Sequence, residues 1–240
     1  QDLCRIFDEI PETIEADLNK LLLQLERQSE ANPAEAGLRS AQPELTAQER
    51  EEAEELGRSS SLVKRILADY AACGLIGEEA NKLLAYLVTV SRKPAQPLAL
   101  LILSSSGAGK TALQDAALAF VPEEDQLKLT SLSGKALFYK ERDALKHKVL
   151  ALEEGAGAEE ASYAIRNLIS AGELVTESTI KDLGTGRLTT MENRVEGPTA
   201  VMLTTTRPDT DPETKSRFFV TAGDESREQT RAILEAQRKA

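Results

Sequence analysis

Several residue types are scarce in this chain, and each scarcity narrows the class of protein. Trp is absent and aromatic residues make up only 4% of the 240 residues, so Leu, Ala and Val must fill the core. The two cysteines, Cys4 and Cys73, have no partner at CxxC spacing, which favours buried thiols over a disulfide or a metal site. The single histidine, His147, argues against a zinc centre as well.

Long apolar runs and excess positive charge are also missing. The longest apolar run, residues 97–103, is far shorter than the ~20 residues that a membrane helix needs, and no signal sequence opens the chain. We therefore expect a cytoplasmic protein with no membrane partner. The net charge of −11 gives no general attraction for nucleic acid, so any DNA contact must be local. Because the chain begins with Gln1 rather than Met, we expect a piece of a longer protein.

The composition changes along the chain and predicts a helical part followed by an α/β domain. Residues 1–58 are expected to form an N-terminal helical segment that ends in a linker or a solvated helix. Residues 59–93 read as a helical lead-in, and from 94 to 240 short apolar runs alternate with helical stretches. This alternation is typical of a parallel sheet with helices on both faces. The predicted strands are residues 98–103, 127–132, 149–152, 200–203 and 218–220.

A phosphate-binding loop follows the first predicted strand and precedes a helix that starts near Lys110. Small residues let successive backbone N–H groups curl around phosphate oxygens at a helix N-terminus, whose dipole favours an anion. Lys110 would reach the terminal phosphates, and the Thr111 hydroxyl would bind Mg²⁺. The predicted nucleotide-binding residues are Ser105, Ser106, Gly107, Ala108, Gly109, Lys110, Thr111 and Ala112.

The loop departs from the pattern GxxxxGK[ST] at one position, where Ser104 replaces the first glycine. The alternative interpretation is a Ser/Gly turn before a helix. The order strand, loop, helix favours the phosphate loop, and it implies ATP and Mg²⁺ as ligands.

Two carboxylates, Glu153 and Glu154, directly follow the predicted strand 149–152. Because ligands of open parallel sheets bind at the carboxyl ends of the strands, these carboxylates are expected beside the phosphate loop. Glu153 would bind Mg²⁺, and Glu154 would orient and deprotonate the attacking water. The alternative is an acidic start of a solvated helix.

Two further features are candidates for the same chemistry. The strand 200–203 ends in Thr204, Thr205 and Thr206, whose hydroxyls would hold water or the terminal phosphate, unless they are simply good strand formers. Arg217 precedes the last strand, where it would stabilise transition-state charge in a neighbouring subunit's site. The alternative is an ordinary surface arginine.

A β-hairpin is predicted over about residues 173–195, because two Thr/Val/Ile-rich segments flank a clear turn signal at 181–186. Lys181 lies at its tip and Arg187 at the base of its second strand. In a ring-forming ATPase such basic residues would grip the backbone of a single DNA strand. The alternative is an edge decoration that pins the sheet.

Taken together, the phosphate loop, the Glu-Glu strand end, the hairpin before the Thr-tipped strand and Ser216-Arg217-Phe218 resemble the AAA+ ATPases. The arrangement looks most like the helicase branch with a presensor-1 β-hairpin, which includes MCM and superfamily-three helicases. Residues 104–110, 132–139 and 224–230 are similar to bacterial primases with attached helicase domains.

The resemblance covers residues 61–240 and implies a three-layer AAA+ fold that assembles as a hexamer, hydrolyses ATP at subunit interfaces and translocates on DNA. It implies Lys110 and Thr111 as Walker A, Glu153 and Glu154 as Walker B, and Thr205 as sensor 1. It further implies Arg217 as the arginine finger, Lys181 at the DNA, and either Arg227 or Arg231 as sensor 2. The short spacing between the Walker motifs departs from MCM proteins, and one helix after residue 220 is less than a full AAA+ lid.

The sequence leaves three hypotheses of function open. The first is a hexameric DNA helicase or translocase acting on single-stranded or forked DNA, with a primase domain in the same or a neighbouring chain. The second is a nucleotide-switched loader that remodels a protein partner, which the acidic charge favours. The third is a degenerate ATPase retained for assembly, suggested by Ser104 and Glu153.

Overall fold

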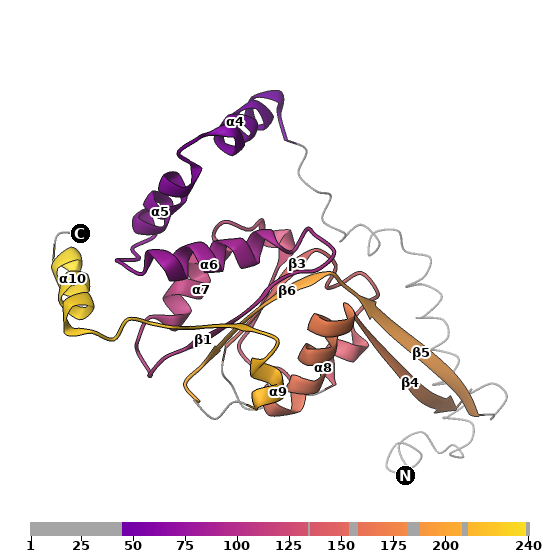
Figure 1. Cartoon of the computed structure of the whole chain (residues 1–240). Coiled ribbons are helices and arrows are strands. Elements are labelled where there is room, and N and C mark those ends of the chain that lie inside the picture. The colour runs from indigo at the N-terminus through magenta and orange to yellow at the C-terminus, as the bar shows by residue number, and fades with distance from the viewer. Residues whose placement is uncertain (1–44, 134, 154–157, 182–187, 208–210, 239–240) are drawn as a thin grey trace, which may run out of the picture. The chain divides into compact units, whose positions relative to one another are not determined.

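The computed structural model describes residues 45–133, 135–153, 158–181, 188–207 and 211–238 (Figure 1). Contacts divide the chain into residues 1–52 and 53–240. Helix α4 (Ala47–Arg58) crosses that division and has no buried residue, in agreement with the solvated helix expected there. The helices predicted within residues 1–44 lie outside the described residues. No helix in the described ranges combines the length and the apolar character that crossing a membrane requires.

Five parallel strands form the central sheet of residues 53–240. They are β1 (Ala99–Leu103), β2 (Gln126–Leu129), β3 (Lys148–Leu152), β6 (Thr199–Thr205) and β7 (Phe219–Ala222). Their order is β2-β3-β6-β1-β7, and every neighbouring pair is parallel. The predicted α/β fold with a parallel sheet is therefore confirmed.

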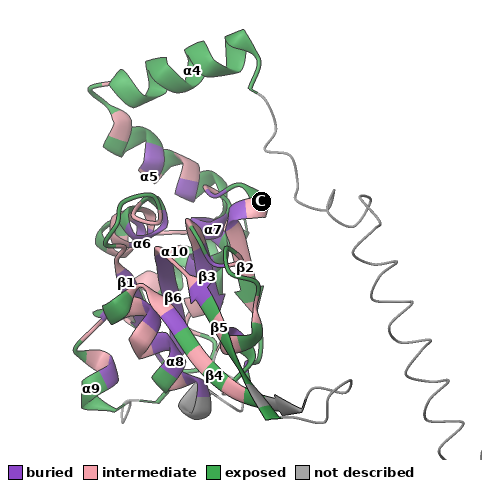
Figure 2. Ribbon diagram, turned by 90° about the vertical axis from the view of Figure 1, so that its right-hand side faces the viewer, coloured by how far each residue is buried: buried purple, intermediate pink, exposed green. Residues whose placement is uncertain are grey.

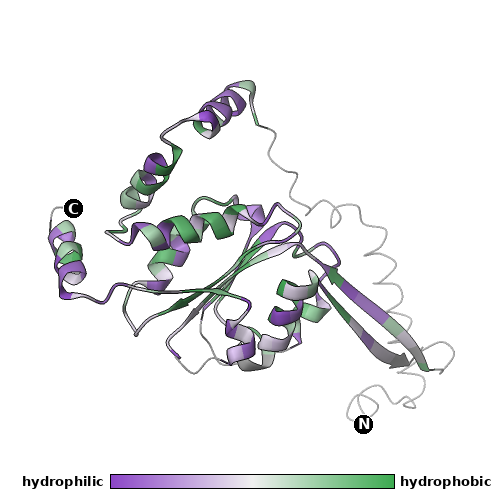
Figure 3. Ribbon diagram, in the orientation of Figure 1, coloured by the Kyte–Doolittle hydropathy of each residue, from purple (hydrophilic) through white to green (hydrophobic). Residues whose placement is uncertain are grey.

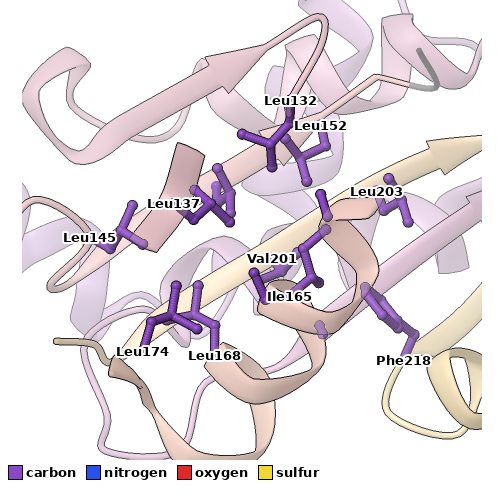
Figure 4. Close-up of a cluster of buried hydrophobic side chains, with 14 of the residues drawn as sticks. Leu132, Leu137, Leu145, Leu152, Ile165, Leu168, Leu174, Val201, Leu203 and Phe218 are labelled. Atoms are coloured by element: carbon purple, nitrogen blue, oxygen red, sulfur yellow. The ribbon is translucent and has the colours of Figure 1, made fainter. Parts of the chain in front are cut away.

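Alternating residues along these strands face two separate cores, because successive side chains of a strand point to opposite faces. On one face Leu101, Leu150 and Val201 pack with helix α8 (Ala158–Ala171). Figure 4 shows this cluster from close by, with Leu152 and Ile165 among its members. Both faces are buried, which explains why the strands read as continuous apolar runs.

The opposite face carries the second core. Leu100, Ile102 and Met202 pack there against helices α5 (Leu62–Ala72), α6 (Glu79–Val90) and α7 (Lys110–Leu118). The helical lead-in is thus part of the same core as the sheet. Figure 2 shows the buried strands between this helical layer and α8, and Figure 3 shows that the central strands are among the most hydrophobic segments.

Short elements complete the chain. The 3-10 helix η1 (Glu123–Asp125) precedes β2, and η2 (Ala136–Tyr139) lies between β2 and β3. Helix α9 (Pro212–Lys215) precedes β7, and α10 (Arg227–Gln237) follows it as the single last helix. The second predicted strand is shorter than expected, since β2 ends at Leu129 and Leu132 packs into the α8 core from a loop.

The predicted β-hairpin is confirmed as β4 (Glu173–Lys181) paired antiparallel with β5 (Leu188–Glu196). Its base is anchored, because Leu174 and Val195 are buried in the α8 core. The Asn193 side chain also donates a hydrogen bond to the Phe138 carbonyl oxygen. Beyond the base the hairpin runs away from the sheet (Figure 1), with Val175, Met191 and Leu188 exposed. The turn at 182–187 lies outside the described residues.

Candidate nucleotide site

The loop between β1 and α7 has the backbone conformation that a phosphate loop needs. Gly107 and Gly109 both have φ of 81°, a left-handed conformation that residues with a Cβ rarely adopt. Gly109 is the N-cap of α7 and has no side chain that could accept hydrogen bonds from the first turn. The backbone N–H groups of this turn, which begins at Lys110, can therefore bind an anion. Ser104 N–H donates to the Thr205 carbonyl oxygen at 3.3 Å, which fixes the start of the loop to β6.

Lys110 is folded back on the loop that precedes it. Its Nζ donates to the carbonyl oxygens of Ser104 at 2.8 Å and of Ser105 at 2.5 Å. The ammonium group therefore lies directly over the loop rather than in solvent. The predicted role of Lys110 on the terminal phosphates requires a rotation of its side chain away from these two carbonyls.

A carboxylate already lies on the first amide of the loop. The backbone N–H of Ser105 donates to Glu225 Oε1 at 2.7 Å. This bond, a bond from the Ser105 hydroxyl and the charge of Lys110 together hold the pKa of Glu225 below its usual value. The loop thus binds an anionic oxygen of its own chain at the position where a phosphate oxygen is expected, and it fits such a ligand.

The departure from the glycine pattern has a structural reason. Ser104 Oγ accepts a hydrogen bond from the backbone N–H of Gly223 at 2.7 Å. A Cβ on Gly223 would lie 2.8 Å from that oxygen and 3.1 Å from the Ala108 carbonyl oxygen. Ser104 therefore ties the loop to the segment after β7, and this segment can approach so closely only because residue 223 is glycine.

A cleft of about 670 Å³ adjoins the loop, within the usual range for small-molecule sites. Its wall opposite the loop comes from the connection between α5 and α6 and from α10, with Leu75, Ile76 and Ile233 among the apolar residues. Lys82 is buried in this wall, and its Nζ donates to the Leu75 carbonyl oxygen at 3.0 Å.

Hydrogen bonds hold the two parts of this wall together. Glu78, whose φ is 56°, accepts from the Asp224 backbone N–H at 2.7 Å. Gln229 Nε2 donates to the Ile76 carbonyl oxygen at 2.5 Å, and Asn81 Nδ2 donates to the Ala222 carbonyl oxygen at 2.9 Å. Sequence reasoning did not find this wall. The only local signals were the two glycines between α5 and α6 and the polar stretch 224–230.

Glu153 lies at the carboxyl end of β3, as predicted, and is linked to the helix that follows the loop. Its Oε1 is 3.0 Å from Lys128 Nζ, which is also 2.6 Å from Asp115 Oδ1. Asp115 belongs to α7, one turn after Thr111. The hydrogen bonds to Asp115 and Glu153 raise the pKa of Lys128. Glu154, the predicted base, lies outside the described residues.

Gln114 connects the same helix to two strands, β3 and β6. Its Nε2 donates to the carbonyl oxygens of Met202 at 3.1 Å and of Leu152 at 3.5 Å. Gln114 is fully buried, so these bonds hold α7 against the middle of β6 and the carboxyl end of β3. Because β6 lies between β1 and β3, the loop and Glu153 are about two strand spacings apart, or ~10 Å.

Thr205 and Arg217 lie at opposite ends of the sheet. Thr205 is the buried last residue of β6 and is in register with Leu103, immediately before the loop. Its Oγ1 accepts a hydrogen bond from the Arg207 backbone N–H at 3.1 Å. Arg217 precedes β7, and its Nε donates to Ser170 Oγ at 2.8 Å, on α8. The structure therefore brings Thr205 to the loop of its own chain and does not bring Arg217 there.

The remaining predicted residues have these positions. Thr111 and Ala112 lie in the exposed first turn of α7. Arg227 is the first residue of α10, and the Arg231 side chain there pairs with Glu235 at 3.1 Å. Lys181 ends β4, but its side chain is not among those described, and Arg187 lies outside the described residues.

The parallel sheet, the glycine-containing loop and the helix that begins at its lysine define a P-loop NTPase domain, a class that generally binds a nucleotide with Mg²⁺. The family model described as the MTBMA_p00010 P-loop domain matches residues 45–240, and the chain belongs to this family. No curated protein matches the chain.

Proposed function

We propose that this domain binds ATP with Mg²⁺ and hydrolyses its terminal phosphoanhydride bond. The observation that carries the proposal is the placement of the Ser105 amide and Glu153 at the ends of β1 and β3, with helix α7 linked to both strand ends. Bound Mg²⁺ would neutralise negative charge on the phosphates.

Each residue then has a stated task. The amides of residues 105–110 hold phosphate oxygens, and Lys110 leaves the carbonyls of its own loop to pair with the terminal phosphates. Thr111 and Glu153 would hold the metal, and Glu154 would orient the attacking water and accept its proton. The Thr205 hydroxyl lies at the end of β6, the strand between β1 and β3, and would position the water or the terminal phosphate.

The test is ATP binding and hydrolysis by three variants. Lys110→Ala is expected to weaken ATP binding by at least tenfold, and Glu154→Gln to keep binding while reducing turnover by at least a hundredfold. Lys64→Ala, at an exposed position of α5, is the matched control and should behave as the wild type. Turnover equal in the wild type and in Lys110→Ala would contradict the proposal and support a degenerate ATPase.

The finer proposal is a motor that moves on single-stranded or forked DNA. It is supported by the long hairpin, whose base is anchored in the core while its far part is exposed. The double change Lys181→Ala with Arg187→Ala should abolish stimulation of hydrolysis by single-stranded DNA without changing the basal rate. If stimulation persists in this variant, the hairpin does not contact DNA.

A ring, proposed to be a hexamer, would give Arg217 a role in catalysis. The arginine lies at the end of the sheet away from its own loop, so any charge that it supplies to a nucleotide would be in the site of a neighbouring subunit. Mixing Arg217→Ala with Lys110→Ala subunits should restore part of the activity that each variant lacks alone, because some interfaces then combine two intact halves. Light scattering gives the ring size, and a monomer that hydrolyses ATP at the full rate would contradict the ring.

One observation favours a second function, in which nucleotide binding switches the domain between states that load or remodel a protein partner. The net charge of −11 opposes general binding to DNA. A loader should capture a protein in the presence of ATP and without DNA, whereas the motor should not require one. Capture that depends on Lys110, together with no effect of DNA on hydrolysis, would replace the motor by the loader.

A further inference from the structure

The segment from Gly223 to Gln229 crosses the mouth of the phosphate loop and is held there from both sides. On the loop side, Ser104 Oγ accepts from Gly223 N–H, and Ser105 N–H donates to Glu225. On the other side, Glu78 accepts from Asp224 N–H and Gln229 donates to the Ile76 carbonyl oxygen. These contacts join parts of the chain that are more than 100 residues apart, so the position of Glu225 is set by the fold.

Two groups of the loop that a phosphate would use, the Ser105 amide and the Lys110 ammonium, already have partners in this chain. The carboxylate takes the Ser105 amide, and the two carbonyl oxygens of residues 104 and 105 take the Lys110 ammonium. A carboxylate and a phosphate are both anionic acceptors, and a single amide cannot give its full hydrogen bond to both. The carboxylate also places a negative charge near Lys110, where phosphate charge must come.

We propose that Glu225 is an autoinhibitory carboxylate that competes with the phosphates of the nucleotide for the first amide of the loop. Phosphate binding displaces Glu225, and its release loosens the hold of the loop on α10, which begins two residues later. Occupancy of the site is thereby coupled to the C-terminal helix that forms one wall of the cleft. This inference rests on the proposed function, since it takes a nucleotide phosphate as the competing ligand.

The test compares Glu225→Ala with the wild type for three probes: ATP, inorganic pyrophosphate and adenosine. If the carboxylate occupies the amide for most of the time, its removal should tighten ATP and pyrophosphate binding about fivefold or more. Adenosine has no phosphate, so its affinity should not change. Glu228→Gln, three residues further along in the exposed first turn of α10, is the matched control and should leave all three affinities unchanged.

Each other result has a defined meaning. Equal affinities of wild type and Glu225→Ala for ATP would overturn the autoinhibitory role alone and leave the proposed function standing. An equal gain for adenosine would also overturn it, because the segment would then act by covering the cleft. If neither protein binds ATP or pyrophosphate, the proposed function and this inference both fail. Should Glu225→Ala not fold, Glu225→Gln keeps the size of the side chain, and it should show the same gain to a smaller degree.

Discussion

At the scale of single residues, the site depends on close approaches that tolerate no extra atoms. Ser104 departs from the usual glycine of the loop, and its hydroxyl receives the amide of Gly223. The two residues therefore form a matched pair, in which the amino acid at one position restricts the amino acids that fit at the other. The pairing was invisible to motif reasoning, because it joins positions that are far apart in the sequence.

Gly223→Ala should lower the free energy of unfolding by about 1 to 3 kcal/mol, since the new methyl group would overlap Ser104 Oγ and the Ala108 carbonyl. Ser104→Ala alone should cost about 1 kcal/mol through the lost hydrogen bond. The double variant should lose less than the sum, because the alanine at 104 relieves part of the overlap. Urea unfolding of the four proteins measures this, and strict additivity would contradict direct contact.

A second residue-scale prediction concerns Tyr70, which is fully buried on α5 and whose ring lies 4.7 Å from that of Phe120. In the part of the chain that the structure describes, its hydroxyl has no hydrogen-bond partner. Burial raises the pKa of this group. Tyr70→Phe removes the unsatisfied hydroxyl and keeps the ring, so it should stabilise the protein by about 1 kcal/mol. A lower melting temperature for this variant would show that the hydroxyl is satisfied in solution.

At the scale of elements, one carboxylate fixes the connection between the lead-in helices and the sheet. Asp125 in η1 accepts hydrogen bonds from Arg92 at 3.1 Å and Lys93 at 2.8 Å, just after α6. Burial alone would raise the pKa of Asp125, but the bonds from Lys93 and Arg92 outweigh burial and lower the pKa below its usual value. The ionised carboxylate is therefore the form that stabilises the fold.

Asp125→Asn should lower the free energy of unfolding by about 2 kcal/mol at pH 7, where the charge-assisted bonds are fully formed. Because the folded pKa is lowered, this contribution is present above the unfolded pKa and is lost as the pH falls through the folded pKa. The difference between the two proteins should therefore shrink steadily below about pH 4. A constant difference down to pH 2.5 would mean that the charge of Asp125 is not what stabilises the connection.

The elements also mark where sequence reasoning succeeded. A strand that is buried on both faces appears in the sequence as a run of apolar residues, such as 98–103. The phosphate loop directly follows this run, so β1, the loop and α7 could all be predicted. Glu153 was placed for the same reason, because parallel strands end at one edge of the sheet. Three features could not be predicted, because they depend on strand order and on tertiary contacts: the pairing of Glu153 with Lys128, the bonds of Gln114 to β3 and β6, and the place of Glu225.

At the scale of the whole molecule, the β4–β5 hairpin projects from the domain, and removing its outer part should leave the fold of the remaining domain intact. Its ends are adjacent, because Gly197 N–H donates to the Gly172 carbonyl oxygen at 2.7 Å. Among the hairpin residues whose side chains the structure describes, only the second pair, Leu174 and Val195, belongs to the core. The outer part contributes exposed surface and its own ladder of hydrogen bonds.

Replacing residues 176–193 by Asn-Gly, between the paired Val175 and Arg194, should therefore leave the melting temperature within a few degrees of the wild type. The basal ATPase rate should also stay, while any stimulation by single-stranded DNA is lost. Loss of the basal rate in a protein that still melts cooperatively would show that the hairpin supports the site itself, for example through the contact of Asn193 with η2.

The strand order has a last consequence. With β6 between β1 and β3, the sheet sets the distance between the phosphate loop after β1 and the Glu153 carboxylate after β3, at the same edge. Hydrogen bonding fixes that separation at two strand widths, so side-chain substitutions cannot reset it. A relative that bound a larger or smaller group between the loop and this carboxylate would therefore need a side chain of different length at position 153, while the strand spacing stayed the same.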